Sequence, residues 1–366
     1  MNWQKLSKLP EPLLRTTLRS LLSYHYHRQH MMDAKGILKR IERAKGPLSR
    51  WLVKQCNDYA IDVFGHRHFA AWLYVYSAVA GKFMEGWIPD NYYGSVVRPR
   101  LKGVYGKISG LKSLHPAVFS SESFPDILSY VNGVFFDTDY RVIHPDSVKG
   151  MIFSDRERVV FKLDNSSRGK GIWFFDRESF GLSKVCGLGN GVFQSLINQH
   201  ELFREFAGAS VATLRMTTVI TDTGTTSLRA CYLRLGNGTD THVQSSSHIR
   251  IPIDIKTGAF NHVGFTTDWL EIESHPASKV KFEGKLIPVY DDCRKLVTSL
   301  HKRVPYARCI GWDLAVDDQE RVRIMEWNAQ HNDIKFSEAT QGPCFSDLQW
   351  ERLTKSEEAP WIEIVW

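Results

Sequence analysis

The sequence predicts an α+β protein with a helical N-terminal region, and three observations support this class. Apolar residues recur at helical spacing over about the first 95 residues. From about Leu101 the pattern changes to short β-like runs separated by polar turns. Two further β-like runs lie close together between residues 308 and 341, which predicts a β-hairpin near the C-terminus.

Composition indicates a soluble globular protein of two or three lobes. The chain has 366 residues, of which 43% are hydrophobic and 24% charged. No apolar run approaches the roughly 20 residues of a membrane helix, and no signal peptide is expected at the start. The six cysteines are widely spaced without a CxxC pair, which argues against a zinc site and predicts reduced thiols in the cytoplasm.

The charge balance is mildly basic, with a formal net charge of +7. Such a balance can favour polyphosphates, nucleic acids or anionic membrane surfaces. The sequence contains no nucleic-acid-binding signature, so a nucleic-acid partner is not expected. Oligomeric state cannot be derived from these features.

The N-terminal region combines leucines at helical spacing with basic residues. Leu14, Leu18 and Leu21 alternate with Arg15 and Arg19, which is typical of a basic amphipathic helix. Such a helix can lie on a membrane surface or pack on its own protein, and both alternatives remain open. Residues 69–93 begin with an all-round apolar stretch that predicts a buried helix, followed by a loop.

The elements after Leu101 follow one another as short strands and helices. A helix-like run begins at Lys107 and is expected to end at Pro116. Strands are predicted at 131–137, 159–163 and 172–175, a hairpin at 212–220 and 228–235, and a helix at 291–302.

The C-terminal hairpin pairs 309–316 with 321–327 and places acidic residues on one face. A turn centred between residues 319 and 320 puts Asp313 opposite Glu326, and alternation puts Asn328 on the same face. No donor within this group neutralises the carboxylates, and hard oxygen ligands of this kind suit Mg²⁺. The alternative is a solvated hairpin with ordinary polar residues.

The segment 164–171, DNSSRGKG, is a Gly-rich turn between two strands. Its small residues can present backbone N–H groups to an anion, and Gly169 and Gly171 permit close approach. Lys162 lies within the preceding apolar strand and needs a partner, which a triphosphate would supply. The spacing is not that of a P-loop. A plain hairpin turn is the alternative reading.

Two arginines, Arg215 and Arg234, are predicted on paired strands. They could clamp carboxylate or phosphate oxygens, or form surface salt bridges. The apolar segment 193–197 could act as a hinge between lobes and offer main-chain groups to an adenine ring.

In this order, the features resemble the ATP-grasp superfamily. The resemblance rests on the strand lysine, the Gly-rich turn, the arginine hairpin, the 13-residue separation of Asp313 and Glu326, and the terminal Glu-x-Asn. It is closest to the sugar-transfer-associated ATP-grasp proteins, through stretches such as FMEGWIPDNYY, TLRMTTVI and GWDLAVDDQERVRIMEWN, and covers roughly residues 69–341. It implies two α+β lobes that hold ATP between antiparallel sheets, with a helical region at 1–100, a first lobe at 101–192 and a second at 193–366.

The resemblance also implies roles for individual residues. Asp313, Glu326 and Asn328 match magnesium ligands, while Arg215 and Arg234 match arginines near the γ-phosphate or acyl phosphate. The nucleotide-binding positions implied are Lys107 (with Lys112 as the alternative), Lys162, Ser166, Ser167, Gly169, Gly171, Gln194, Ser195 and Leu196. The chain departs from the family pattern at Leu163, at Arg168 and in the AQHND that follows Glu-x-Asn.

The activity implied is that of an ADP-forming carboxylate–amine ligase that uses ATP and Mg²⁺ and proceeds through an acyl phosphate. Its partners would be a small carboxylate, such as an amino acid, and an amine or sugar-linked acceptor in surface polysaccharide or peptide biosynthesis. His248 could orient the acceptor, act as a base, or be purely structural. Two other functions remain: an ATP-grasp kinase for a sugar or alcohol, and a non-catalytic scaffold of a polysaccharide assembly complex.

Overall fold

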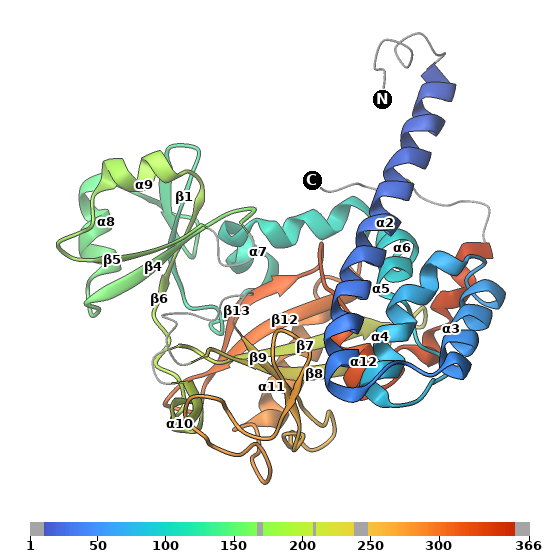
Figure 1. The fold of residues 1–366 in the computed structure, drawn as a ribbon. Coiled ribbons are helices and arrows are strands. Elements are labelled where there is room, and N and C mark those ends of the chain that lie inside the picture. Colours follow the sequence, from blue (N-terminus) through green and yellow to red (C-terminus); the bar gives the residue numbers. More distant parts are fainter. Residues whose placement is uncertain (1–10, 167–170, 208–209, 238–247, 356–366) are drawn as a thin grey trace. The chain divides into compact units, whose positions relative to one another are not determined.

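The computed structural model describes residues 11–166, 171–207, 210–237 and 248–355, which form two compact units (Figure 1). The first unit contains the residues up to Gly103, the short segment 268–270, and the residues from Asp333 onward. The second contains residues 104–267 and 271–332. The C-terminal segment therefore groups with the N-terminal helices, whereas the sequence-based division ran a second lobe to residue 366.

The first unit is helical, as the apolar spacing predicts. In its fourth helix Trp72, Leu73 and Val75 are buried, which confirms the buried helix expected after Phe69. That helix ends at Gly81, whose φ of 71° is the left-handed conformation of a helix C-cap. The helices of this unit are α2 Glu11–Lys45, α3 Arg50–Asp62, η1 Arg67–Phe69, α4 Ala70–Ala80, α5 Asp90–Tyr92, η2 Tyr93–Val97, α6 Arg98–Lys102, α12 Lys335–Gln341, η5 Ser346–Leu348 and η6 Trp350–Lys355.

A buried carboxylate, Glu338 of α12, ties two loops of the first unit together. Its two carboxylate oxygens accept the backbone N–H groups of Ile88 and Cys344, both at 2.8 Å. Its main-chain carbonyl accepts the indole N–H of Trp87 at 2.8 Å. No cation is paired with the carboxylate among these contacts, and burial raises the pKa of Glu338 to about 8.

The titration of Glu338 predicts that the first unit loses stability as pH rises. An unfolded Glu loses its proton near pH 4.5, whereas folded Glu338 keeps it until about pH 8. Between these values the native state binds more protons, so the free energy of unfolding falls with pH, by about 3–5 kcal/mol. In chemical unfolding from pH 4 to 9, Glu338→Gln is expected to lack this fall. The exposed Glu85→Gln is expected to retain it, and an unchanged slope in Glu338→Gln contradicts the assignment.

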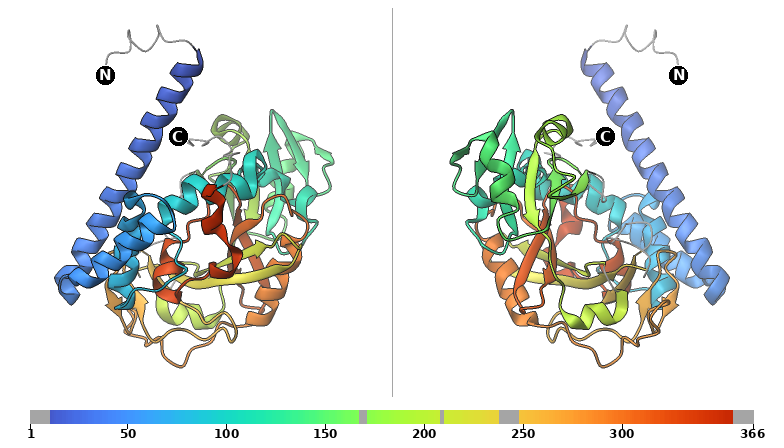
Figure 2. Two further views of the ribbon diagram at one scale, coloured as in Figure 1. Left: turned by 90° about the vertical axis from the view of Figure 1, so that its right-hand side faces the viewer. Right: turned by 90° about the vertical axis from the view of Figure 1, so that its left-hand side faces the viewer.

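The second unit contains two antiparallel sheets, which can be followed in Figure 2. The six-stranded sheet has the order β3-β2-β1-β6-β4-β5, and the seven-stranded sheet has the order β11-β10-β9-β8-β7-β12-β13. The strands of the first sheet are β1 Asp126–Val131, β2 Val134–Asp137, β3 Val142–Ile143, β4 Arg158–Leu163, β5 Ile172–Asp176 and β6 Gly191–Ser195. Those of the second are β7 Thr213–Ile220, β8 Thr226–Leu235, β9 Ile249–Pro252, β10 Gly264–Phe265, β11 Glu271–Ile272, β12 Cys309–Val316 and β13 Val322–Asn328.

Short helices connect the strands of the second unit. They are η3 Gly103–Gly110, η4 Lys112–Leu114, α7 His115–Phe119, α8 Pro145–Ile152, α9 Leu182–Leu188, α10 Glu201–Ala207 and α11 Tyr290–His301. The predicted strands at 159–163 and 172–175, the hairpin of β7 and β8, and the helix at 291–302 are all confirmed.

Two local expectations were wrong. Residues 131–137 do not form one strand, because Asn132 (φ 51°) and Gly133 (φ 90°) make a tight turn between β1 and β2. An Asn-Gly pair is the strongest short signal for such a hairpin, because both central residues need positive φ. Pro116 does not end a helix but occupies the first turn of α7, where its missing N–H costs nothing.

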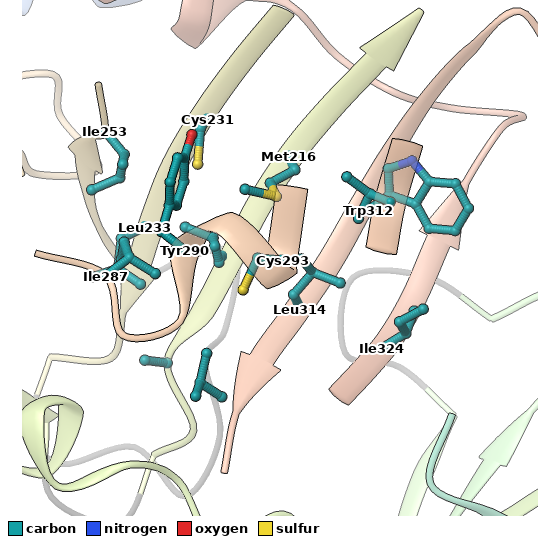
Figure 3. Packing of buried hydrophobic residues seen from close by; sticks show 14 of the residues in the cluster. Met216, Cys231, Leu233, Ile253, Ile287, Tyr290, Cys293, Trp312, Leu314 and Ile324 are labelled. Atoms are coloured by element: carbon teal, nitrogen blue, oxygen red, sulfur yellow. The ribbon is translucent and has the colours of Figure 1, made fainter. Parts of the chain in front are cut away.

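The core of the seven-stranded sheet lies under helix α11 (Figure 3). Tyr290 and Cys293 of α11 point toward the sheet, where Cys231, Leu233 and Met216 are buried. All eight residues of β7 and all eight of β12 are buried, so both faces of these central strands are covered. The opposite face of these central strands therefore carries the polar residues of the candidate site in a largely dry environment.

Candidate active site

The hairpin of β12 and β13 has the predicted register at its acidic positions. Asp313 pairs with Glu326, and Gly311 pairs with Asn328. The two tryptophans of the intervening pair, Trp312 and Trp327, are buried in the core on the other face. Alternation therefore keeps Asp313, Glu326 and Asn328 on the face away from α11.

Nearer the turn the register shifts by one residue. Leu314 pairs with Ile324, so Met325 has no partner and forms a β-bulge. The turn is centred on Gln319 and not between residues 319 and 320 as the sequence suggested. Ile324 and Trp327 both face the core although they are three residues apart, which a regular strand does not allow.

Asp313 is held by two arginines. The carboxylate is 6% exposed and accepts from Nε of Arg215 at 2.5 Å and from Nη2 at 2.9 Å, and Nη2 of Arg234 also donates to it. The sequence reading considered donors only within the group of Asp313, Glu326 and Asn328, and the structure supplies two from outside that group. Burial would raise the pKa of Asp313, but the two guanidiniums outweigh it and lower the pKa to about 2.

The position of Arg215 is fixed by neighbours that the sequence reading missed. Arg215 lies opposite Asp313 in the ladder, and its Nη1 donates to the side-chain oxygen of the buried Asn332 at 3.2 Å. Asn332 fits there because position 311 is glycine: a Cβ on Gly311 would lie 2.1 Å from that oxygen and 3.1 Å from Nη1 of Arg215. The glycine of GWD therefore leaves room for the residue that orients Arg215.

Gly311→Ala is expected to destabilise the protein by roughly 1–3 kcal/mol, because the new methyl group overlaps Asn332. The substitution should also weaken the binding of any anion that Arg215 holds. Equilibrium unfolding in urea measures the first effect. The matched control is Gly187→Ala in α9, where no atom lies within 4 Å of the added Cβ and a small stabilisation is expected. Equal stabilities of the two variants would contradict the packing argument.

Two lysines approach the acidic face from the six-stranded sheet and its preceding helices. Lys112 is 3% exposed, its Nζ donates to the carbonyls of Leu163 (3.1 Å) and Ser166 (3.3 Å), and it lies 3.9 Å from Oε1 of Glu326. Lys107, the first candidate for this role, is exposed in η3. The structure thus brings the alternative, Lys112, to the site.

Lys162 occupies the predicted strand and has few partners within the described part of the chain. Its Nζ donates to the carbonyl of the bulge residue Met325 at 3.5 Å. The bulge explains this contact, because Met325 is outside the regular ladder. Burial lowers the pKa of Lys162, against the opposing effect of Glu326. A partly buried ammonium with one long hydrogen bond is a group that an anionic ligand would stabilise.

The Gly-rich turn is described at its two ends only, since Ser167 and Gly169 lie outside the described residues. Ser166 donates from Oγ to the carbonyl of Leu163 at 2.7 Å. Gly171 has a φ of 74°, and a Cβ there would lie 2.7 Å from Cβ of Ser166. Leu163 N–H donates to the carbonyl of Gly171 at 2.9 Å, which closes the base of the turn.

The proposed hinge residues have side chains engaged within the protein. Gln194 is fully buried and its Nε2 donates to Asp126 at 2.6 Å, while Asp126 lies 3.2 Å from Nδ1 of His115. Ser195 Oγ accepts from Nε of Arg156 at 2.9 Å. Leu196 is 39% exposed. Asp126 and His115 belong to no sequence motif, so their pairing could not be predicted from the sequence.

Arg234 has an arginine beside it on the next strand. Arg250 of β9 pairs with Arg234 in the ladder, is 8% exposed, and donates to the carbonyl of Thr266 at 3.3 Å. The sequence reading missed Arg250, although strict alternation in Ile249–Pro252 would have placed it on a definite face. His248 is half-buried immediately before β9. Its role in orienting an acceptor remains a prediction.

The residues described so far fit a polyphosphate with a divalent cation. Lys112, Lys162, Arg215 and Arg234 supply four positive charges, against two negative charges from Asp313 and Glu326. Glu326 has a side chain 33% exposed, with its nearest cation 3.9 Å away, so its oxygens are accessible. Carboxylate and amide oxygens are the ligands that Mg²⁺ prefers.

A model of the sugar-transfer associated ATP-grasp family matches residues 180–349. The match covers the seven-stranded sheet and the candidate metal ligands, and confirms the resemblance that the motifs indicated. Together with the two antiparallel sheets and the N-terminal helical region, it confirms the predicted ATP-grasp fold class. No curated protein matches the chain.

Solved structures similar to this chain include a biotin carboxylase domain and two ligases. The biotin carboxylase domain of 2-oxoglutarate carboxylase from Hydrogenobacter thermophilus is 11% identical, with a TM-score of 0.39, over 69% of this chain and 46% of that one. The ATP-grasp ligase PsnB is 14% identical (TM-score 0.39; 78% and 69%), and the D-alanine-D-alanine ligase from Coxiella burnetii is 10% identical (TM-score 0.39; 69% and 60%). The chain spans about half the length of the biotin carboxylases that it matches.

Proposed function

We propose that the protein is an ATP-dependent, ADP-forming carboxylate–amine ligase. The observation that carries this proposal is the meeting of Lys112 and Lys162 with Glu326 and the bulge carbonyl of Met325. These groups come from two different sheets or the helices beside them, and lie next to the Arg215–Asp313 pair. The site has charge to hold phosphates, and phosphoryl transfer needs positioning and charge neutralisation more than covalent help from the protein.

In the proposed reaction a substrate carboxylate oxygen attacks the γ-phosphorus of ATP. The bond between the γ-phosphorus and the β,γ-bridging oxygen breaks, which releases ADP and leaves an acyl phosphate. An amine then attacks the acyl carbon, the carbon–oxygen bond breaks, and phosphate leaves as the amide forms. The nitrogen loses a proton in this step.

Each group of residues in the site would have its own role in this reaction. Lys112 and Lys162 would balance charge on the phosphates, and Arg215 and Arg234 would stabilise the transferred group, as preorganised cations do in a site shielded from water. Asp313, Glu326 and Asn328 would hold Mg²⁺, which supplies charge neutralisation to the phosphate oxygens when bound.

The test is a product assay with purified protein, ATP, Mg²⁺ and pooled amino acids, with and without aminosugars. ADP release that needs both a carboxylate and an amine, with a product of amide mass, is the expected result. ADP with a phosphorylated sugar would instead establish the kinase. Absence of both ADP and an ATP-induced thermal shift would favour the scaffold.

We further propose that α2 contacts an anionic membrane surface. Leu21, Tyr24, Arg28, Met31 and Lys35 follow one another at spacings of three and four, so they lie on one side of the helix. The apolar members are 36–68% exposed, and the basic members are also exposed. Apolar and basic side chains on one exposed stripe are typical of helices that lie in a membrane interface. No helix in the described part of the chain is long and apolar enough to span a bilayer.

The double variant Leu21→Gln/Met31→Gln is expected to weaken vesicle binding about tenfold, because it removes two apolar side chains from the stripe. Co-sedimentation with vesicles of equal parts phosphatidylcholine and phosphatidylglycerol measures this. Trp51→Ala, which removes an aromatic side chain 66% exposed on α3, should leave binding unchanged. Binding to pure phosphatidylcholine at the same strength, or none to either vesicle, would overturn the proposal.

A further inference from the structure

A cavity of about 630 Å³ lies beside the base of the Gly-rich turn, within the second unit. Its walls include Tyr105, Lys107 and Leu111 from η3 and the turn after it, Asn165 from the turn that follows β4, and Tyr306 from the loop before β12. This volume is within the usual range of small-molecule sites. None of these residues belongs to the site as the structure forms it, since Lys112 takes the place there that the sequence had first given to Lys107.

The aromatic walls present exposed faces to the cavity. Tyr105 is 63% exposed and Tyr306 is 39% exposed, and their ring centroids lie 5.5 Å apart with the planes tilted by 46°. Because the two rings lie side by side, they form a contiguous exposed apolar patch, which is the kind of surface that marks binding sites. They offer flat apolar surface to a ligand ring, while Lys107 and Asn165 supply an ammonium and an amide at the same cavity.

The cavity is coupled to the phosphate side of the site through Asn165. Asn165 has a φ of 53°, which is uncommon outside glycine, and its N–H donates to the carbonyl of Gly110 at 2.6 Å. On either side of it in the chain, Leu163 and Ser166 provide the carbonyls that hold Lys112. The cavity wall and the lysine anchor are therefore built from the same short segment.

We propose that this cavity binds the pyranose ring of the acceptor. A pyranose has one face of C–H groups, which fits on tyrosine, and a rim of hydroxyls, which suits an ammonium and an amide. A pyranose uses both the aromatic faces and the polar groups of the cavity, whereas a purely aromatic ligand uses only the faces. Among the described residues that line the cavity, Lys107 is the one cation, which does not favour a charged polymer. The assignment rests on the proposed function and extends it: the amine that attacks the acyl phosphate would be attached to a sugar.

Saturation-transfer NMR with the full chain tests the assignment. The probes are methyl glycosides of hexoses, hexosamines and N-acetylhexosamines, with methyl benzoate as the aromatic comparison. At least one glycoside is expected to bind, and Tyr105→Ala and Tyr306→Ala are each expected to weaken it about tenfold. Tyr105→Trp should restore binding, since it keeps an aromatic face. Tyr24→Ala on α2, a tyrosine 68% exposed, is the matched control and should bind as the native chain does.

Three results overturn the assignment: no glycoside binds, methyl benzoate binds in preference to every glycoside, or Tyr105→Ala binds glycosides undiminished. The ATP-induced thermal shift separates this outcome from failure of the proposed function. Tyr105→Ala should keep the shift, because it lies outside the phosphate site, while Lys162→Met should lose the shift and keep glycoside binding. A native chain that binds glycosides but shows no ATP shift would retain the sugar site and reject the ligase.

Discussion

Glu326→Gln is expected to reduce ATP turnover at least about 100-fold while leaving the fold intact. The substitution keeps the shape of the side chain and removes its charge. Glu326 is the accessible carboxylate of the acidic face and the one nearest to Lys112. Loss of its charge removes a metal ligand and leaves the Lys112 ammonium without its nearby carboxylate. ADP release, measured at saturating ATP and Mg²⁺, gives the effect on turnover.

The matched control is Glu320→Gln, which changes an exposed glutamate in the turn of the same hairpin. It should turn over ATP like the native chain. Circular dichroism and the melting temperature of both variants should equal those of the native protein, because neither position is buried. Unchanged turnover in Glu326→Gln would reject the metal assignment.

Lys162→Met is expected to change stability and binding in opposite directions. Without nucleotide the melting temperature should rise by about 2–4 °C, because a partly buried ammonium with one long hydrogen bond is replaced by an apolar chain of similar length. With ATP and Mg²⁺ the thermal shift seen in the native protein should disappear. The exposed Lys149→Met in α8 should leave both quantities unchanged.

The same substitution has a signature in pH. The folded-state pKa of Lys162 lies below its ordinary 10.5, so between the two values the unfolded chain binds more protons. The free energy of unfolding of the native protein should therefore rise with pH through that window, and the Met variant should lack this rise. A Met variant that melts lower than the native protein and keeps its ATP shift would show that Lys162 is structural.

Much of the fold could be predicted from local pattern. The seven-stranded sheet is built on hairpins with clear turns, so β7 with β8 and β12 with β13 were found at nearly correct bounds. The errors arose where one residue type has two roles. Pro116 can end a helix or begin one, and the Asn132–Gly133 pair interrupts an apolar run that otherwise looks like a single strand.

The candidate site could be predicted as a set of residues but not as a network. Ladder register relates Asp313 to Glu326, because strand pairing is local in sequence. It does not relate Asp313 to Arg234, Gln194 to Asp126, or Lys112 to Glu326, since these contacts join segments from 68 to 214 residues apart. A buried carboxylate paired with two arginines has no sequence signature, so the sequence did not predict the pairing of Asp313 with Arg215 and Arg234.

The bulge at Met325 explains why Asp313 and Glu326 are separated by 13 residues. With the turn that this hairpin adopts, a separation of 12 would give an uninterrupted ladder and the same two faces. The observed separation of 13 adds one residue that the sheet itself does not need. Its carbonyl is the group that Lys162 contacts. The separation of 13 therefore marks a hairpin whose second strand has one extra residue, and the main-chain carbonyl of that residue contacts a lysine of the other sheet.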